Sequence, residues 1–372
     1  MRKAQNWNQP CPNKQCKDYG QMNKGNISSV SSYMSKSGKR RIFKCSSCGE
    51  MFSETRDTVF FDLRTEEDKV IMALKMILVK VSLSGISFVL GVKEETLLIW
   101  LDRAYQKAEQ INAYLLKELP VTEVQLDEMW SFVKKKVFDQ GEIESPQGAE
   151  DGRQWIWISY APQFRLILAT VVGPRTYESA LTLIQITASI VLGVPCFFSD
   201  GFSCYLQALI ECYHQIKTFA RTGKRGRPRN PVKEPHPDLV YGQVVKEKEG
   251  GRIKNITHRV KCGVAKFAQL GLTISTTLLE RLNLTFRQAL APLCRKTLSF
   301  SKDKKNLKRQ VVFFQAFYNF ARPHMSLRET VSNTNESFKQ KWRQRTPGMA
   351  AGLTDHVWSF RELLTIKFSH EP

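Results

Sequence analysis

Long apolar runs are missing from this sequence. No stretch reaches the roughly 18 apolar residues that a membrane-spanning helix needs, and the opening residues, MRKAQNWNQP, lack the apolar core of a signal peptide. We therefore expect a cytoplasmic protein without membrane contact. Residues 1–60 also contain too little hydrophobic material for a core of their own, so something other than packing must hold that segment together.

Acidic residues are outnumbered. The 372 residues include 56 lysines and arginines against 35 aspartates and glutamates, a formal net charge of +21. Such an excess indicates a polyanionic partner, because each cation set against a phosphate releases a condensed counterion. Nucleic acid is the first candidate, since an anionic membrane surface or an acidic protein would not explain the motifs below. With 42% hydrophobic residues, the chain can form two or three packed domains.

Four of the nine cysteines stand within the first 60 residues, which indicates a metal site because disulfides do not persist in a reducing compartment. Cys11 and Cys16 form one pair, and after 28 intervening residues Cys45 and Cys48 form another. Two such pairs supply the four thiolates of a structural, tetrahedral Zn²⁺ site. The alternative is a chance grouping of cysteines. The other five are expected to be small buried hydrophobes: Cys196, Cys204, Cys212, Cys262 and Cys294.

Helical periodicity fills residues 61–119, where three helices fit. The segment LSGISFVLGVKEETLLIWLDRA matches the plan of a helix-turn-helix, with Gly91 in the turn. Lys93 and Thr96 would then begin the helix that contacts DNA, although the two acidic residues between them are unusual on a surface that reads bases. The alternative is an ordinary three-helix bundle.

From about residue 120 the pattern changes to short β-rich runs, a helix, and a compact apolar run, PCFFSD. This order predicts an α/β domain over 120–330, interrupted at 221–261 by a basic segment rich in glycine and proline, and followed by a polar tail at 331–372. Asp127 lies inside the first run, where a carboxylate is costly unless a metal or partner compensates it. Asp200 ends the run PCFFSD, at the end of a strand where ligands bind to α/β sheets.

These two aspartates, 73 positions apart, resemble the first two acids of the DDE transposase and integrase superfamily, whose catalytic domain has the ribonuclease H-like fold. The third acid of that family lies on a later helix, and Glu280 in STTLLERLNLTFRQAL is the best match. The motifs LLERLNLTFRQ, RKTLSFSK and YNFARPH resemble insertion-sequence-one-type transposases, over about residues 11–327. The 79 residues between Asp200 and Glu280 are more than the compact members of the family have.

The resemblance implies a DNA transposase with an α/β, ribonuclease H-like catalytic domain, preceded by a zinc ribbon at 1–60 and an all-α helix-turn-helix at 61–119. Asp127, Asp200 and Glu280 would hold two Mg²⁺ or Mn²⁺ ions, which activate water and neutralise charge on the phosphate. Further residues would contact the site or DNA: Arg281, Asn283, Arg287 and His324. The partners would be double-stranded DNA, as element ends and target, and further copies of the chain in a homo-oligomer.

Other interpretations remain open for the same residues. Asp200 could merely cap the following helix, and Glu280 could be an ordinary solvated residue. Alternation along the strand puts Glu128 on the opposite face from Asp127, away from the metals. At the level of function, the alternatives are a non-catalytic zinc-ribbon and helix-turn-helix regulator, and a ribonuclease H-like nuclease that cuts without joining.

The basic insertion contains KRGRPR, which looks like an AT-hook core. Arg225, Arg227 and Arg229 would enter a narrow A·T-rich minor groove, whose negative potential attracts arginine. The alternative is a solvated basic linker that contacts phosphates indiscriminately. A second basic stretch, RKTLSFSKDKKNLKR, is expected to contact phosphates rather than bases.

Overall fold

The computed structural model describes residues 7, 9–134, 152–219, 229–250, 252–330 and 342–369. The N-terminal unit contains a small antiparallel sheet: β1 (Ile27–Ser35), β2 (Gly38–Cys45) and β3 (Met51–Ser53). Its core is confined to six buried residues, which are Ile27, Phe43, Phe52 and three of the early cysteines. This unit therefore has as little hydrophobic core as the sequence predicts.

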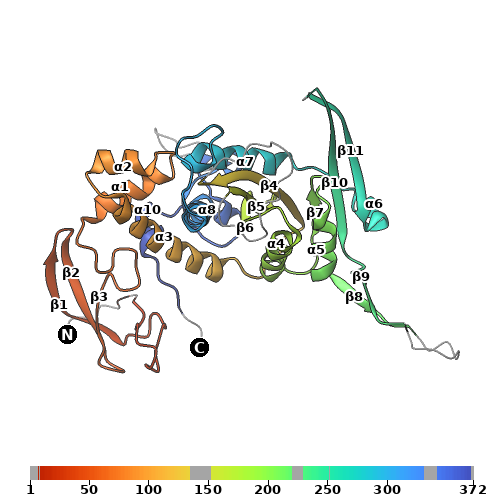
Figure 1. Ribbon diagram of the computed structural model, residues 1–372. Helices are drawn as coiled ribbons and strands as arrows, with labels where there is room; N and C mark the ends of the chain where they lie inside the picture. The colour runs from red at the N-terminus through yellow and green to blue at the C-terminus, as the bar shows by residue number, and fades with distance from the viewer. Residues whose placement is uncertain are drawn as a thin grey trace.

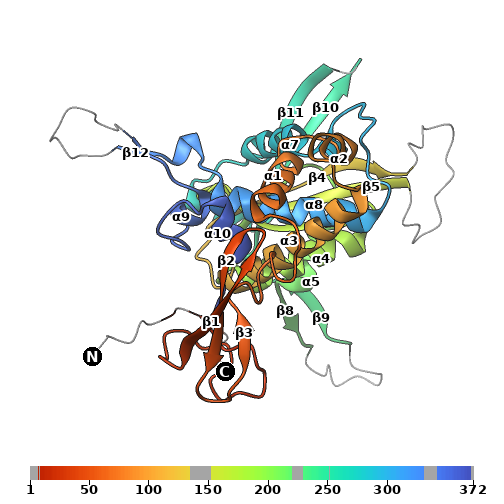
Figure 2. The same ribbon diagram turned by 90° about the vertical axis from the view of Figure 1, so that its left-hand side faces the viewer.

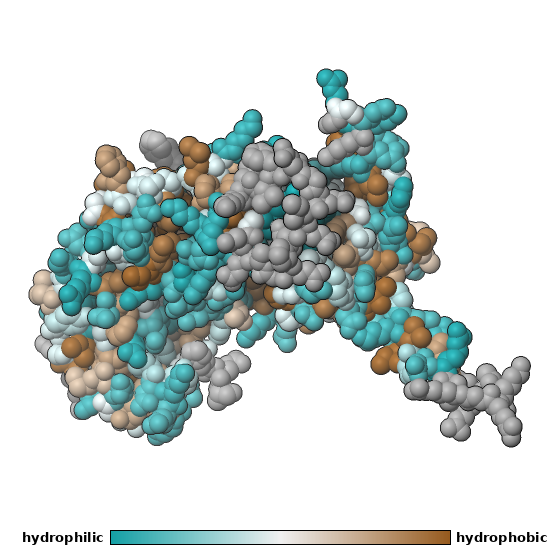
Figure 3. Space-filling model, viewed as in Figure 1, coloured by the Kyte–Doolittle hydropathy of each residue, from teal (hydrophilic) through white to brown (hydrophobic). Residues whose placement is uncertain are grey.

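Three helices follow, where the periodicity predicts them: α1 (Glu67–Ile77), α2 (Leu83–Leu90) and α3 (Glu94–Leu115). Ser82 caps α2 by accepting a hydrogen bond from the Gly85 N–H at 3.0 Å. Gly91 ends the same helix in the left-handed region, at a φ of 59°, which favours glycine. Apolar side chains protrude over α2 in the space-filling view (Figure 3), where Phe88 is 89% exposed.

The centre of the molecule is a six-stranded mixed sheet (Figure 1). Its strands are β4 (Glu123–Val133), β5 (Gly152–Ala161), β6 (Leu166–Gly173), β7 (Cys196–Ser199), β10 (Val240–Glu249) and β11 (Arg252–Cys262). The spatial order is β11-β10-β7-β4-β5-β6. Strands β4, β5 and β6 are antiparallel neighbours, whereas β7 runs parallel to β4 and β10 runs parallel to β7. The described chain is therefore a mixed α/β protein.

Helices cover both faces of this sheet: α4 (Tyr177–Ile190), α5 (Cys204–Cys212), α7 (Thr277–Ala289) and α8 (Lys304–Ala316). Helices α4 and α5 pack together below β4, and α7 lies above it, in both Figure 1 and Figure 2. Helix α8 packs between β6 and α3, and so joins the helical segment to the sheet. Within the described residues, none of the helices has the length and apolarity needed to cross a membrane.

Strand β10 departs from the expected organisation, because it lies inside the stretch predicted to interrupt the fold. Its first residues, Val240 and Tyr241, are fully buried beside β7. Charged residues occupy the last four positions of β10, from Lys246 to Glu249, and they obscure the strand in the sequence. The projecting parts are the outer ends of β10 and β11 and a second hairpin, formed by β8 (His214–Lys217) and β9 (Val232–Pro235) (Figure 1).

The segment after α8 packs against the central sheet. Asn319 is fully buried; its side chain accepts a hydrogen bond from the Ile167 N–H at 3.0 Å and donates one to the Ile167 carbonyl at 2.8 Å. The YNFARPH motif is thereby fixed to β6. Trp358 and Phe360 pack in the main core. The remaining elements are short: α6 (Val264–Leu270), turns of 3-10 helix at Ala291–Leu293 and Met325–Leu327, a π-helical turn at Phe317–Ala321, β12 (Glu329–Thr330), β13 (Trp342–Arg343), α9 (Pro347–Ala350) and α10 (Phe360–Thr365).

Candidate functional site

Two strands bring Asp127 and Asp200 together. Leu126 of β4 pairs in register with Ser199, the last residue of the parallel strand β7. The two aspartates follow these residues directly, so parallel pairing places them side by side where β7 ends. One carboxylate oxygen from each, together with one from Glu128, lie within 4.8 Å of one another. We refer to Asp127, Glu128 and Asp200 as the carboxylate cluster.

The surroundings of Asp127 disfavour an uncompensated negative charge. Asn283 Nδ2 donates a hydrogen bond to its Oδ2 at 2.6 Å, and the Glu128 backbone N–H donates to its Oδ1 at 2.9 Å. Burial nevertheless raises the pKa of Asp127 to about 7, and the negative charge of Asp200 adds to the rise. A divalent cation between the carboxylates would offset this repulsion, and Mg²⁺ and Mn²⁺ prefer such oxygen ligands. The donor set therefore fits a hard cation.

Glu128 also reaches the cluster, contrary to the expectation that it would stay clear of it. Its side chain does point to the opposite face of β4 from Asp127, toward Tyr205 of α5. Its carboxylate still approaches Asp200, because β7 ends one residue earlier and Asp200 lies beyond the strand. Arg175 Nε donates to Glu128 Oε1 at 2.8 Å, and the Tyr205 hydroxyl donates to Oε2 at 3.0 Å. Both oxygens of Glu128 are thus held by side chains of this chain.

Glu280 lies on α7, at the edge of the carboxylate cluster rather than in it. Its side chain is 47% exposed and forms an ion pair with Lys246 of β10. The Thr276 hydroxyl donates to the same carboxylate at 3.1 Å. After burial and Asp200, the charge of Glu280 is a further cause of the raised pKa of Asp127. The structure thus brings two of the three predicted acids together and leaves the third beside them, paired with a lysine.

Helix α7 presents its polar side to the carboxylate cluster. Its buried face consists of Leu279, Leu282, Phe286 and Ala289. Asn283, one turn after Glu280, ties the helix to Asp127. Arg287, one turn further on, donates to the Leu293 carbonyl at 2.9 Å, and burial lowers its pKa. Arg287 therefore joins α7 to the turn that follows it.

The region of His324 is strongly cationic. Burial lowers the pKa of His324, and the positive charges of Arg165, Arg322 and Arg281 lower it further. Arg281 itself is exposed on α7. A histidine among three arginines is suited to contact with a phosphate backbone rather than to base readout.

The other residues predicted to contact DNA lie away from the carboxylate cluster or outside the described chain. Lys93 is exposed just before α3, and its carbonyl accepts a hydrogen bond from the Thr96 N–H at 3.0 Å. Arg225 and Arg227 lie outside the described residues, so the AT-hook stays a prediction. Arg229 lies at the start of the next described segment, with its guanidinium 4.9 Å from the ring centroid of Phe219.

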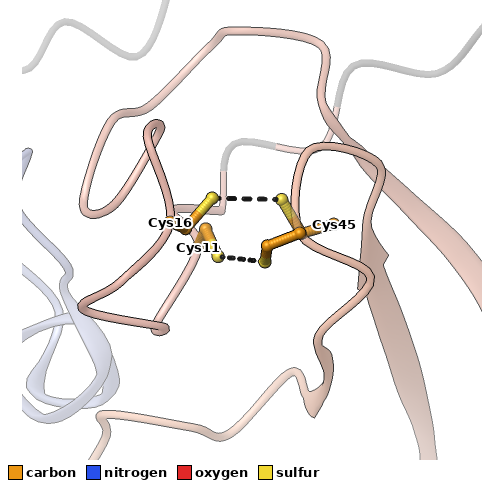
Figure 4. A group of neighbouring side chains, drawn as sticks. Cys11, Cys16 and Cys45 are labelled. Carbon is orange, nitrogen blue, oxygen red and sulfur yellow. Dashed lines mark hydrogen bonds between the residues drawn. The ribbon is translucent and has the colours of Figure 1, made fainter.

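The four early cysteines converge on one point (Figure 4), where the loop with Cys11 and Cys16 faces Cys45. Cys11 Sγ lies 3.6 Å from Cys48 Sγ, and Cys16 Sγ lies 3.9 Å from Cys45 Sγ. Tetrahedral zinc with Zn–S bonds near 2.3 Å separates its sulfurs by about 3.8 Å. Burial raises the pKa of Cys11 and Cys16, whereas the N–H groups of Ser47 and Cys48 outweigh burial at Cys45 and lower its pKa to about 7. The four thiols therefore fit a structural zinc ion.

Arg175, Tyr205 and Lys246 are the residues near the carboxylate cluster that sequence reasoning missed. The Arg175 guanidinium lies between two aromatic rings, 4.5 Å from the centroid of Phe202 and 4.9 Å from that of Trp155. Its position two residues after an apolar strand was the one available signal, because strand ends gather site residues. Nothing in the local sequence distinguishes Tyr205 or Lys246 from packing or surface residues.

No protein-family model matches the sequence, and no curated protein matches it. Among solved structures, the Mos1 transposase paired-end complex with left transposon end is similar at 14% identity and a TM-score of 0.16, over 40% of this chain and 57% of that chain. The Mos1 strand transfer complex is similar at 14% identity and a TM-score of 0.16, over 40% and 55%. A pre-cleavage Mos1 transpososome matches at 9% identity and a TM-score of 0.16, over 66% and 76%. These similarities are too low to define a shared fold, and the first two span little more than half of the Mos1 chain.

Proposed function

We propose that this chain is a DNA transposase of the DDE type, which binds insertion-element ends and catalyses metal-dependent strand cleavage and strand transfer. One observation carries the proposal: β4 and β7 bring Asp127 and Asp200 together, and Asn283 ties the helix that bears Glu280 to Asp127. The strand order supports the ribonuclease H-like fold that the sequence resemblance implies. The motif LLERLNLTFRQ, which forms most of α7, supports the insertion-sequence-one-like subtype.

In this proposal Asp127, Asp200 and Glu280 hold two Mg²⁺ or Mn²⁺ ions. Bound there, the ions would supply a hydroxide nucleophile near neutral pH and neutralise charge on the phosphate. Asn283 orients Asp127 by its hydrogen bond at 2.6 Å. Lys246 must release Glu280 for this glutamate to join the two aspartates. Hydrolysis of a phosphodiester at the element end would free a 3′-hydroxyl. This hydroxyl would attack a phosphodiester of target DNA in the same site and displace the target strand's own 3′-oxygen, so no covalent link between protein and DNA is needed.

The N-terminal parts would hold the DNA. Cys11, Cys16, Cys45 and Cys48 form a zinc ribbon in this proposal, and α2 with α3 forms the helix-turn-helix. The net charge of +21 supplies affinity for the backbone of element ends and target. Because recombination joins two DNA ends, we propose a homo-oligomer. We propose that the protein acts in the cytoplasm.

The test is cleavage of DNA that carries the element ends, by purified full-length protein with Mg²⁺ or Mn²⁺. Wild-type protein should nick these ends and form strand-transfer products on a gel, whereas Asp127→Asn should do neither. The matched control is Asp355→Asn, which changes the same group where the side chain is 94% exposed. This control should cut and join as the wild type does.

Two results would replace the proposal with its alternatives. If DNA binds but is not nicked by the wild type, or if Asp127→Asn nicks it equally well, the chain is a zinc-ribbon and helix-turn-helix regulator. If DNA is cut and no strand-transfer product forms, it is a ribonuclease H-like nuclease.

A further inference from the structure

A cavity of about 800 Å³ lies where the N-terminal unit, α3 and the C-terminal segment meet, and none of the carboxylate cluster lines it. Six cationic side chains line this basic cavity: Lys14, Arg56, Arg103, Lys107, Lys117 and Lys367. Among its described lining residues Asp57 is the only acid. The cavity therefore carries a large local excess of positive charge.

Two of these cations, the buried Lys107 and the half-buried Lys367, contact polar groups that carry no full negative charge. Lys107 is 5% exposed, and its ammonium donates to the Asp57 carbonyl at 2.6 Å, to Gln110 Oε1 at 2.8 Å and to the Ile366 carbonyl at 3.3 Å. Lys367 donates to Gln9 Oε1 at 2.6 Å and to the Glu54 carbonyl at 3.2 Å. In the described part of the chain, no carboxylate lies within ion-pair distance of either ammonium.

The two lysines also repel each other. Burial lowers the pKa of each to about 8, although Asp57 opposes the change, and the charge of Lys107 is a further cause for Lys367. A buried charge is costly unless a counter-charge is present, and carbonyl and amide oxygens offset only part of that cost. An anion that entered the cavity would supply the counter-charge to both lysines at once.

Further cationic side chains lie at the solvent-exposed rim of the cavity. Lys14 and Lys117 are exposed, so their side chains are free to follow a ligand. Tyr114 and Phe368 stack there with their ring centroids 4.2 Å apart, and the Lys117 ammonium lies 5.8 Å from the Tyr114 ring. Cations around a stacked aromatic pair suit a sugar-phosphate unit, because the rings contact the sugar or base while the cations bind the phosphate.

We propose that the basic cavity binds a phosphate group, with Lys107 and Lys367 at its floor and Lys14 and Lys117 at its rim. A phosphate is compact and carries acceptor oxygens on all sides, so it can contact several cations that point inward. Two sources can present this group: the backbone of DNA, or a free anion such as pyrophosphate. The site is separate from the cleavage chemistry and does not depend on the carboxylate cluster.

The experiment measures pyrophosphate binding to the full-length protein by titration calorimetry, without added divalent metal and at constant ionic strength. The double variant Lys14→Ala/Lys117→Ala should bind pyrophosphate about tenfold or more weakly, the effect of losing charge-assisted hydrogen bonds. Lys107→Met, which keeps the alkyl stem, should lower the affinity at least as much. The matched control removes two exposed lysines elsewhere, Lys75→Ala/Lys217→Ala, and should bind as the wild type does.

A short DNA duplex added in competition distinguishes the two sources. If the duplex displaces pyrophosphate from the wild type, the DNA backbone is the source; if both bind without competition, a free anion is. Pyrophosphate that binds the rim variant and the control equally would overturn the proposal, as would no saturable binding to the wild type. Asp127→Asn should bind pyrophosphate normally, so failure of the proposed cleavage activity would leave this inference standing.

Discussion

Replacing Asp127 with asparagine should make the metal-free protein more stable at pH 8 and remove its stabilisation by Mg²⁺. Asparagine keeps an acceptor for the Asn283 amide, so the contact between β4 and α7 survives. What disappears is the ionised carboxylate, whose pKa burial and Asp200 raise from 3.8 to about 7. The substitution therefore separates the electrostatic cost of the carboxylate cluster from its packing.

The sign and size follow from proton linkage. Because the folded-state pKa of Asp127 is raised, its protonated form contributes stability below the unfolded value, and this stability is lost as pH rises through about 7. A pKa rise of this size has an upper limit of about 4 kcal/mol. The side chain is partly exposed, so we expect about 2 kcal/mol at pH 8 and little gain at pH 4.

The assay is urea unfolding of wild type and variant at pH 4 and pH 8, with and without Mg²⁺. Mg²⁺ should raise the free energy of unfolding of the wild type at pH 8 and leave that of Asp127→Asn unchanged, because the variant lacks one of the proposed ligands. Asp355→Asn, at an exposed position, should respond as the wild type does. An equal gain at both pH values, or Mg²⁺ stabilisation of the variant equal to that of the wild type, would refute the reasoning.

Three other substitutions test separate parts of the structure. Cys45→Ser should remove one zinc ion per chain by metal analysis and increase proteolysis of residues 9–60, whereas Cys204→Ser, remote from the four-cysteine group, should do neither; zinc retained by Cys45→Ser would contradict the assignment. Lys246→Met should lower the Mg²⁺ concentration for half-maximal cleavage about two- to fivefold, because an exposed ion pair that competes for Glu280 contributes about 0.5–1 kcal/mol. An increased Mg²⁺ requirement would show that Lys246 assists the site instead. Tyr205→Phe should cost about 1–3 kcal/mol in urea unfolding, because Glu128 Oε2 loses its donor in a buried site. Tyr213→Phe, whose buried hydroxyl has no hydrogen-bond partner in the described chain, should cost less, and equal losses would contradict this account.

Local pattern was enough to predict the parts of the fold and site that depend on one segment. The apolar runs around Asp127 and before Asp200 predict two strands, one that contains Asp127 and one that ends at Asp200. Asp127 does lie within β4, and Asp200 directly follows β7. The motif STTLLERLNLTFRQAL predicted the later helix that carries Glu280, and α7 spans Thr277–Ala289. Cysteine spacing predicted a four-cysteine group, and the four sulfurs do converge.

Contacts between distant segments were not predictable in this way. Lys246 meets Glu280 only because β10 joins the sheet beside β7, and the charged residues of β10 concealed that strand. The approach of Glu128 to Asp200 depends on where β7 ends. The alternation of side chains along β4 gives no information about that position. The pairing of Lys367 with Gln9 and Glu54 likewise joins the two ends of the chain.

The position of Glu280 outside the carboxylate cluster is compatible with a role as third ligand, because the barrier to moving it is small. Its side chain is 47% exposed and its partner Lys246 is 29% exposed, so their ion pair contributes at most about 1 kcal/mol. Its backbone, in contrast, is already placed: Asn283, on the same side of α7 and one turn away, contacts Asp127 at 2.6 Å. A cation that attracts three carboxylates would compensate the lost ion pair and the hydrogen bond that the Thr276 hydroxyl donates to Glu280. For this reason Lys246, rather than any movement of α7, should control how readily the third carboxylate joins the site.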